Sequence, residues 1–134
     1  MAINVTANLH FIRAMDSLLR ASTAGRAVFI SSGAASSTRA YNGAYSVSKA
    51  ALTALARTYA AETASTALRV NLLNPGPTRT RMRAMVMPGE DPLTLPTAED
   101  VAEKILALCL PSFGETGKLY DFRAKKLLEF ITPA

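Results

Sequence analysis

Apolar side chains recur every three or four positions in three stretches of this 134-residue chain. The spacing gathers them on one face of a helix, so it predicts long helices over residues 3–22 and 44–65 and a third that begins at Thr97. Thr97 and Asp100 have the outline of a capping box, with aspartate in the place of the usual glutamate or glutamine. Pro111 ends this third helix.

Short apolar runs lie between the helices, and their length and branched side chains are typical of buried strands. We predict strands at 27–30, 68–73 and 118–122. The remaining segments are a loop at 31–43, a short helix at 79–87 and a tail helix at 124–130. Because helices and strands alternate, we expect an α/β layered fold with a parallel sheet and crossover helices, in a single domain over 1–134.

The composition is that of a globular protein, with 49% hydrophobic and 19% charged residues. No apolar run approaches the ~20 residues of a membrane span, and the first residues lack the pattern of a secretory signal. We therefore expect no membrane partner. The single cysteine, Cys109, excludes an internal disulfide and favours the reducing cytoplasm. It lies on the apolar side of the third helix, so we expect it in the core rather than as a nucleophile.

The net charge of +5 raises the question of nucleic-acid binding. The cationic residues are scattered, however, and their densest group is Arg79, Arg81 and Arg83. A solvated surface, or a basic site for an anionic cofactor or substrate, explains the charge more simply, so we expect no nucleic-acid partner.

Candidate chemistry centres on a tyrosine and a lysine. Tyr45 and Lys49 are four residues apart and share one helix face, and Ser32 follows the first predicted strand. Ligands of open α/β sheets bind outside the carboxyl ends of the strands, where these three side chains can converge. A free phenol has a pKa near ~10, and a nearby ammonium favours the phenolate. Such a pair suits proton transfer in a carbonyl/alcohol interconversion with hydride from a cofactor.

The bare spacing is weak support for this chemistry, because a buried tyrosine and a surface lysine four residues apart are common. Five stretches, however, resemble the signatures of the short-chain dehydrogenase/reductase family, in the family's order. They are Asn4-Val5, Val28 to Ser32, Tyr45 to Leu52, Leu68 to Asn71, and Pro75 to Met82. Ser32 rather than Ser31 lies thirteen residues before Tyr45, the offset that the family uses. The resemblance weakens after residue 97, where the family's usual Asp-Gly-Gly ending is absent.

The resemblance implies a doubly wound, Rossmann-like, three-layer sheet and an oxidoreductase that uses NAD or NADP on a small carbonyl or alcohol substrate. It makes Tyr45 the general acid/base and Lys49 the residue that favours the phenolate and binds the nicotinamide ribose. It makes Ser32 the residue that orients the substrate carbonyl. Asn4 would hold a water in a proton relay behind Lys49, although asparagine is also a good helix cap.

The same resemblance implies a cofactor-binding segment after the second strand. The backbone at Pro75, Gly76 and Thr78 would meet the nicotinamide amide, and Thr80 would lie near the phosphates. These positions carry the family's Pro-Gly and Thr elements.

The family's first half has no counterpart here. The 134 residues contain neither a Thr-Gly-x-x-x-Gly-x-Gly turn nor an Asn-Asn-Ala-Gly segment, which in the family hold the adenosine half of the cofactor. We therefore expect a sheet truncated at its N-terminal half, with the strand 27–30 presenting an unpaired apolar edge. A fragment that forms a homodimer or homotetramer through helices 3–22 and 44–65 is one expectation. A catalytically inactive oligomerisation or interaction module is the alternative.

Three further groups of residues have weaker signals. His10 has no partner at metal-ligand spacing, so we predict a surface or packing histidine and no metal site. Residues 76–96 form the longest irregular stretch, which is typical of a functional lid. Its methionines either line a substrate pocket or fill gaps in the core; they are Met82, Met85 and Met87.

Overall fold

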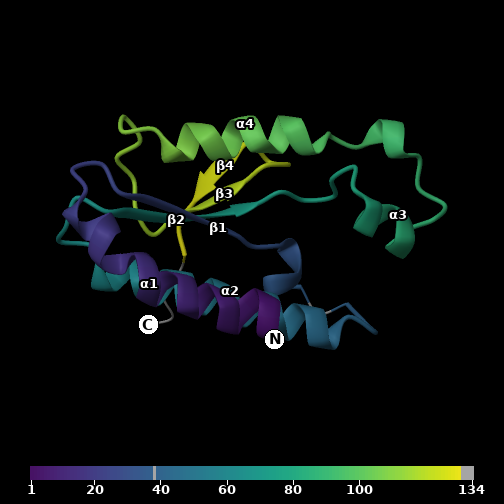
Figure 1. Cartoon of the computed structure of the whole chain (residues 1–134). Coiled ribbons are helices and arrows are strands. Elements are labelled where there is room, and N and C mark those ends of the chain that lie inside the picture. Colours follow the sequence, from purple (N-terminus) through teal and green to yellow (C-terminus); the bar gives the residue numbers. More distant parts are fainter. Residues whose placement is uncertain (38, 131–134) are drawn as a thin grey trace.

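A computed structural model describes residues 1–37 and 39–130, which form one four-stranded sheet in the order β1-β2-β3-β4 (Figure 1). The strands are β1 (Arg26–Ile30), β2 (Arg69–Asn74), β3 (Leu119–Asp121) and β4 (Lys126–Leu128). The first three are parallel, with Ile30 opposite Leu73 and Leu73 opposite Tyr120, and β4 is antiparallel to β3. The predicted parallel sheet is therefore confirmed.

Helices cover both faces of the sheet and give the predicted three layers (Figure 1). Helices α1 (Ala7–Ala21) and α2 (Gly43–Glu62) lie on one face, and α4 (Ala98–Cys109) lies on the other. A π-helical turn at Ala2–Thr6 precedes α1, and the short helix α3 (Arg81–Val86) lies in the irregular segment. The predicted capping box is present, because Thr97 accepts from the Asp100 amide while the Asp100 carboxylate accepts from the Thr97 amide.

The core is built around β2, whose side chains alternate between the two faces of the sheet. Val70 and Leu72 are fully buried and pack in the cluster formed with α2. Leu73 faces the opposite layer, where it packs against Val101 and Leu108 of α4. A strand buried on both faces is the reason why the segment 68–73 is an almost continuous apolar run.

The predicted tail helix at 124–130 is wrong, because the segment forms a hairpin with β3. The Asp121 carboxylate accepts a hydrogen bond from the Ala124 amide at 2.8 Å, and Lys125 has a left-handed φ of 52°. The turn brings Leu128 opposite Leu119. A short apolar and basic stretch fits either a helix or a strand, and the local turn at Asp121 decides for the strand.

The expectation that Cys109 lies in the core is also wrong, and of the two alternatives for the methionines, the filling of core gaps is excluded for Met82 and Met85. Cys109 is exposed at the end of α4, because this helix turns Val101 and Leu108 to the sheet instead. Met82 and Met85 do not fill core gaps, since 64% and 75% of their surfaces are exposed. Their helix α3 lies beyond the end of the sheet (Figure 1), and neither methionine belongs to the two core clusters.

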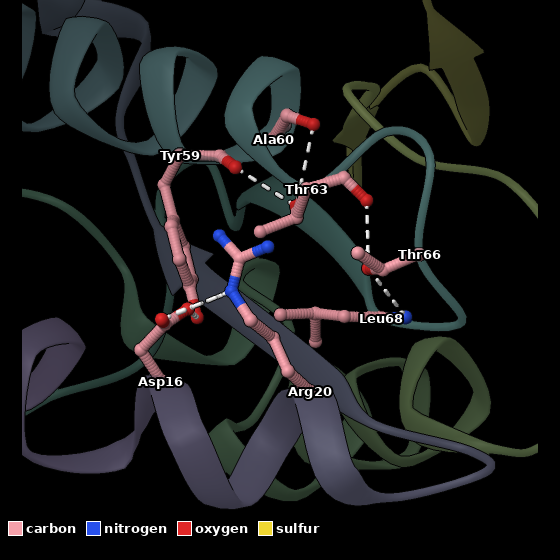
Figure 2. A network of polar contacts seen from close by, with 7 residues as sticks. All are labelled: Asp16, Arg20, Tyr59, Ala60, Thr63, Thr66 and Leu68. Atoms are coloured by element: carbon pink, nitrogen blue, oxygen red, sulfur yellow. Dashed lines mark hydrogen bonds and ion pairs between the residues drawn. The ribbon is translucent and has the colours of Figure 1, made fainter.

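A polar network joins α1 to α2 on the sheet face that they share (Figure 2). The Tyr59 hydroxyl donates to the Asp16 carboxylate at 2.8 Å, and Arg20 donates to the same carboxylate through Nε at 2.7 and 2.9 Å. These bonds from Arg20 and Tyr59 hold the pKa of Asp16 below its usual value of 3.8. Burial and the bond to Asp16 raise the pKa of Tyr59 to about 12. The last turn of α2 is thus tied to the C-terminal half of α1.

Further along α2, threonines shape the turn into β2 (Figure 2). The buried Thr63 hydroxyl lies within hydrogen-bond distance of the Tyr59 and Ala60 carbonyls, and Thr66 donates to the Thr63 carbonyl at 2.8 Å. The Thr66 hydroxyl also accepts from the Leu68 amide. The chain therefore leaves α2 in a defined direction and enters the central strand.

The outer edge of β1 pairs with no strand among the described residues, as the sequence predicted. Within the same residues, no helix is long and apolar enough to cross a membrane.

The network predicts a pH-dependent contribution to stability. Tyr59→Phe removes the hydroxyl that donates to Asp16 and should lower the midpoint of urea unfolding at pH 7. The pKa of Asp16 is depressed in the folded protein, so its contribution is present above the usual value of 3.8 and is lost as the pH falls through the folded value. The difference in urea midpoint between the wild type and Tyr59→Phe should therefore become smaller below about pH 4. Tyr120→Phe is the matched control and should leave the midpoint near that of the wild type.

Candidate active site

The predicted catalytic residues lie around the carboxyl end of β1 and the first turns of α2. Lys49 reaches back to the strand, where its Nζ donates to the carbonyl of Ile30, the last residue of β1, at 2.9 Å. The same Nζ lies 6.0 Å from the centre of the Tyr45 ring. Burial lowers the pKa of Lys49. The strand end therefore fixes the ammonium beside the tyrosine.

Asn4 is held against α2 directly behind this pair. Its side-chain amide donates to Ser48 Oγ at 3.0 Å, and the buried Ser48 hydroxyl donates to the Tyr45 carbonyl at 2.8 Å. Asn4 lies within the π-helical turn and not at a helix cap, so the capping interpretation is wrong. Its role in a water relay stays a prediction.

The two adjacent serines after β1 differ in their surroundings. Ser31 is buried, and its hydroxyl is hydrogen-bonded to Thr53 of α2 at 2.7 Å. Ser32 is half-buried, and its Oγ accepts from the Ala34 amide at the start of a 3-10 turn. Because the Ser32 hydroxyl is the acceptor in that bond, it can still donate its own proton. The Ser31 hydroxyl is instead engaged with Thr53 inside the protein. This difference agrees with the choice of Ser32, although its contact with a substrate stays a prediction.

The segment after β2 contains the predicted cofactor-binding positions. Gly76 has a φ of +66°, a left-handed value that favours glycine, and it follows Pro75 in a tight turn. The Thr78 hydroxyl is within 3.4 Å of the Gly76 carbonyl. Thr80 lies further on, where its hydroxyl accepts from the Arg83 amide and caps α3. The Gly76 turn therefore lies directly after β2, at the start of the irregular segment, whereas Thr80 lies further along it and caps α3.

The irregular segment is closed by an ion pair. Arg83 donates to Glu90 through Nε at 2.6 Å and through Nη2 at 2.7 Å, which holds the pKa of Glu90 below its usual value. Beside this pair is a cavity of about 220 Å³, lined in part by Met87. Arg79 donates to the Leu95 carbonyl. Two of the three clustered arginines are therefore engaged within the segment.

Sequence reasoning missed two residues that organise this region. Ser48 occupies the serine of the Tyr-x-x-Ser-Lys pattern and links Asn4 to Tyr45. Asn74 accepts from the amides of Gly33 and Gly76 and donates to Asp121, so it joins three strand ends. An asparagine two residues before a glycine is a turn signal, and this signal could have indicated Asn74.

Across the residues described, no three side chains of the kinds that bind metals come together as a metal site. His10 is exposed on α1.

Comparison with known proteins identifies the family. The family model for short-chain dehydrogenases matches residues 1–91, so the chain belongs to the short-chain dehydrogenase family. It is 44% identical over 122 residues to the Escherichia coli K12 protein named uncharacterized oxidoreductase YciK. It is 33% identical over 113 residues to the vibriobactin-specific 2,3-dihydro-2,3-dihydroxybenzoate dehydrogenase of Vibrio cholerae. These alignments cover 90% and 84% of this chain but 48% and 43% of the relatives, so the chain spans about half their length.

Solved structures agree with this assignment. A short-chain dehydrogenase from Shigella flexneri 2a, complexed with NADP, superimposes with a TM-score of 0.83 at 41% identity. One from Escherichia coli CFT073, complexed with NADPH, gives a TM-score of 0.83 at 40% identity. Each match covers 90% of this chain, and 51% and 50% of the other chain.

Two serines of α2 provide a matched test of the Asn4 contact. Ser48→Ala removes the acceptor of the Asn4 amide and the donor to the Tyr45 carbonyl, so we expect the free energy of unfolding to fall by about 1–2 kcal/mol. The hydroxyl of Ser46 is buried and has no hydrogen-bond partner among the described residues. Ser46→Ala should therefore be neutral or stabilising. Urea unfolding of both variants measures the two changes in free energy. Equal losses in Ser48→Ala and Ser46→Ala would contradict the predicted link from Asn4 through Ser48 to Tyr45.

Proposed function

We propose that this chain carries the catalytic half of an NAD(P)-dependent oxidoreductase that interconverts a small-molecule carbonyl and alcohol. The observation that carries the proposal is the anchoring of Lys49 on the last carbonyl of β1, with its ammonium 6.0 Å from the Tyr45 ring. Membership of the short-chain dehydrogenase family supports it.

Each residue has a defined part in this proposal. The Tyr45 hydroxyl gives its proton to the substrate oxygen during reduction and takes it back during oxidation. The Lys49 ammonium stabilises the phenolate that remains, because an opposite charge nearby favours the ionised form. The Ser32 hydroxyl donates to the substrate oxygen and orients it. Asn4, held through Ser48, would bind a water in the proton relay behind Lys49.

The residues present fit the nicotinamide half of the cofactor. Lysine has three N–H donors, and Lys49 spends one on Ile30, so donors remain for ribose hydroxyls. Glycine adopts the left-handed φ at position 76 without strain, so the tight turn that would present its backbone to the nicotinamide amide is one that this sequence favours. Bound NAD(P) supplies or accepts the hydride. The adenosine half would be held by groups outside these 134 residues, since the glycine-rich turn is absent from them.

The comparisons guide the choice of cofactor to test first. Two similar structures contain NADP or NADPH, so NADP is the first candidate. We place the protein in the cytoplasm, where its single cysteine would stay reduced.

We further propose that the chain assembles as a homodimer or homotetramer. Four apolar side chains spaced three to eight residues apart are exposed on the N-terminal turn and α1: Ile3, Phe11, Met15 and Leu18. Such a stripe is typical of a helix that packs against another subunit. The same stripe, together with the outer edge of β1, which pairs with no strand among the described residues, favours the second candidate function, an inactive oligomerisation or interaction module. Cofactor binding separates the two candidates.

The proposed function predicts a specific role for Tyr45. Fluorescence or calorimetry should detect saturable binding of NADPH to the chain at micromolar concentrations, if a partner subunit completes the site. Tyr45→Phe should then bind NADPH nearly as the wild type does and lose turnover by at least about a hundredfold, because only the proton donor is removed. The exposed Tyr41 offers the control, and Tyr41→Phe should keep both properties. A folded chain without NADPH binding would support the interaction module instead.

The proposed assembly predicts the effect of a charge in the exposed stripe. Phe11→Glu places a charge in the middle of the exposed stripe and should weaken self-association by at least about tenfold. Light scattering after size exclusion should then give the 14.3 kDa mass of one chain, while the wild type gives a multiple of it. Met82 is similarly exposed but lies on α3, so Met82→Glu should leave the assembly intact. A monomeric wild type would contradict the proposal.

A further inference from the structure

Asn74, the last residue of β2, lies where the ends of three strands meet. Its Oδ1 accepts from the Gly33 amide at 3.0 Å and from the Gly76 amide at 3.1 Å. Its Nδ2 donates to Asp121 Oδ2 at the end of β3, at 3.0 Å. One half-buried side chain therefore contacts the loops after β1 and β2 and the turn after β3.

The chemistry around this amide permits only one orientation. Two N–H donors face the oxygen, and a carboxylate oxygen faces the nitrogen. A flipped amide would place its NH₂ against two N–H groups and its oxygen against a carboxylate. The link therefore requires an acceptor toward the loops and a donor toward Asp121, a combination that asparagine supplies at this length.

The two loops that Asn74 joins carry different parts of the proposed site. Gly33 directly follows Ser32, the residue assigned to the substrate oxygen. Gly76 forms the turn assigned to the nicotinamide. The Asn74 carbonyl also accepts from the Phe122 amide, so both its backbone and its side chain are tied to the β3 hairpin.

We propose that Asn74 is a positioning residue that sets the separation between the Ser32 loop and the Gly76 loop, and that Asp121 holds its amide in the required orientation. In this arrangement one amide holds both the loop that follows Ser32 and the Gly76 turn, which would meet the nicotinamide. The catalytic consequence rests on the proposed function, whereas the link between the loops does not.

A swap of the pair tests this proposal. Asn74→Asp keeps the acceptor for both glycine amides but sets a second carboxylate against Asp121. Two carboxylates at this distance cannot both ionise without separating, so the link should fail at high pH and return when a proton is shared. The double variant, Asn74→Asp with Asp121→Asn, restores a donor opposite an acceptor and keeps the net charge of the wild type. The new side-chain amide at position 121 still has an oxygen that can accept from the Ala124 amide.

Hydrogen exchange reads the link without any cofactor or substrate. In Asn74→Asp at pH 8, the protection factors of the Gly33 and Gly76 amides should fall by about tenfold, the change expected for one lost hydrogen bond. At pH 5 they should approach the wild-type values, and in the double variant they should do so at both pH values. The Leu72 amide, which donates to Lys118 within the sheet, is the internal reference and should not change. A merely structural role would lower the protection of Leu72 equally.

Kinetics then test the catalytic consequence in a protein that turns over. The kcat/KM of Asn74→Asp should fall by about tenfold at pH 8, recover toward pH 5 relative to wild type, and be rescued in the double variant. Unchanged protection of Gly33 and Gly76, or a double variant that is not rescued, would overturn the proposal. If the glycine amides respond as expected but the wild type neither binds NADPH nor turns over, the proposed function fails and the link stands.

Discussion

The burial of β2 on both faces, together with its pairing along both edges, is the constraint on which the rest of the structure depends. Val70, Leu72 and Leu73 are completely buried, and the strand lies between β1 and β3. Water cannot satisfy the backbone of such a strand, so its N–H and C=O groups need both neighbours. The parallel arrangement then follows, because the segments that return the chain to the same end of the sheet are helices. The carboxyl ends of β1, β2 and β3 therefore lie at the same end of the sheet.

This shared end of the sheet explains why the residues of the candidate site lie close together although they are distant in sequence. Ser32 follows β1, Gly76 follows β2, and Lys49 reaches the last carbonyl of β1 from α2. The position of α2 is fixed twice, by apolar packing on β2 and by the Tyr59–Asp16 bond to α1. The second contact matters for chemistry because α1 continues from the turn that holds Asn4. A shift of α1 along α2 would move Asn4 away from Ser48 and so from the tyrosine–lysine pair.

Sequence patterns predicted the strands and long helices because burial imposes a period that the sequence displays. The run 68–73 and the Ala-rich helix 44–65 are examples, and the structure has them within a few residues. The tail was predicted wrongly because a helix and a hairpin strand are both compatible with its few apolar residues, and the turn at Asp121 depends on a side-chain bond to a backbone amide. The burial of Cys109 was wrong for a related reason. Periodicity defines the apolar face of a helix but not which side of that face the sheet covers.

The residues of the candidate site also differ in how far the sequence could predict them. Tyr45 and Lys49 could be selected from spacing and family pattern, since both lie on one helix and their relation is local. Asn74 and Ser48 also depend on partners more than forty positions away in the chain, and a pattern along one segment carries no information about such partners.

The strand β1 takes part in both the fold and the candidate site. The same strand that offers unpaired backbone groups at its outer edge, within the described part of the chain, also offers the Ile30 carbonyl to Lys49. An edge strand held on one side moves more readily than a central strand, so the position of this carbonyl depends on whatever covers the edge. Pairing of that edge would order β1, and with it the Lys49 ammonium and the Ser32 loop. A strand that paired with this edge would therefore also order the proposed catalytic residues.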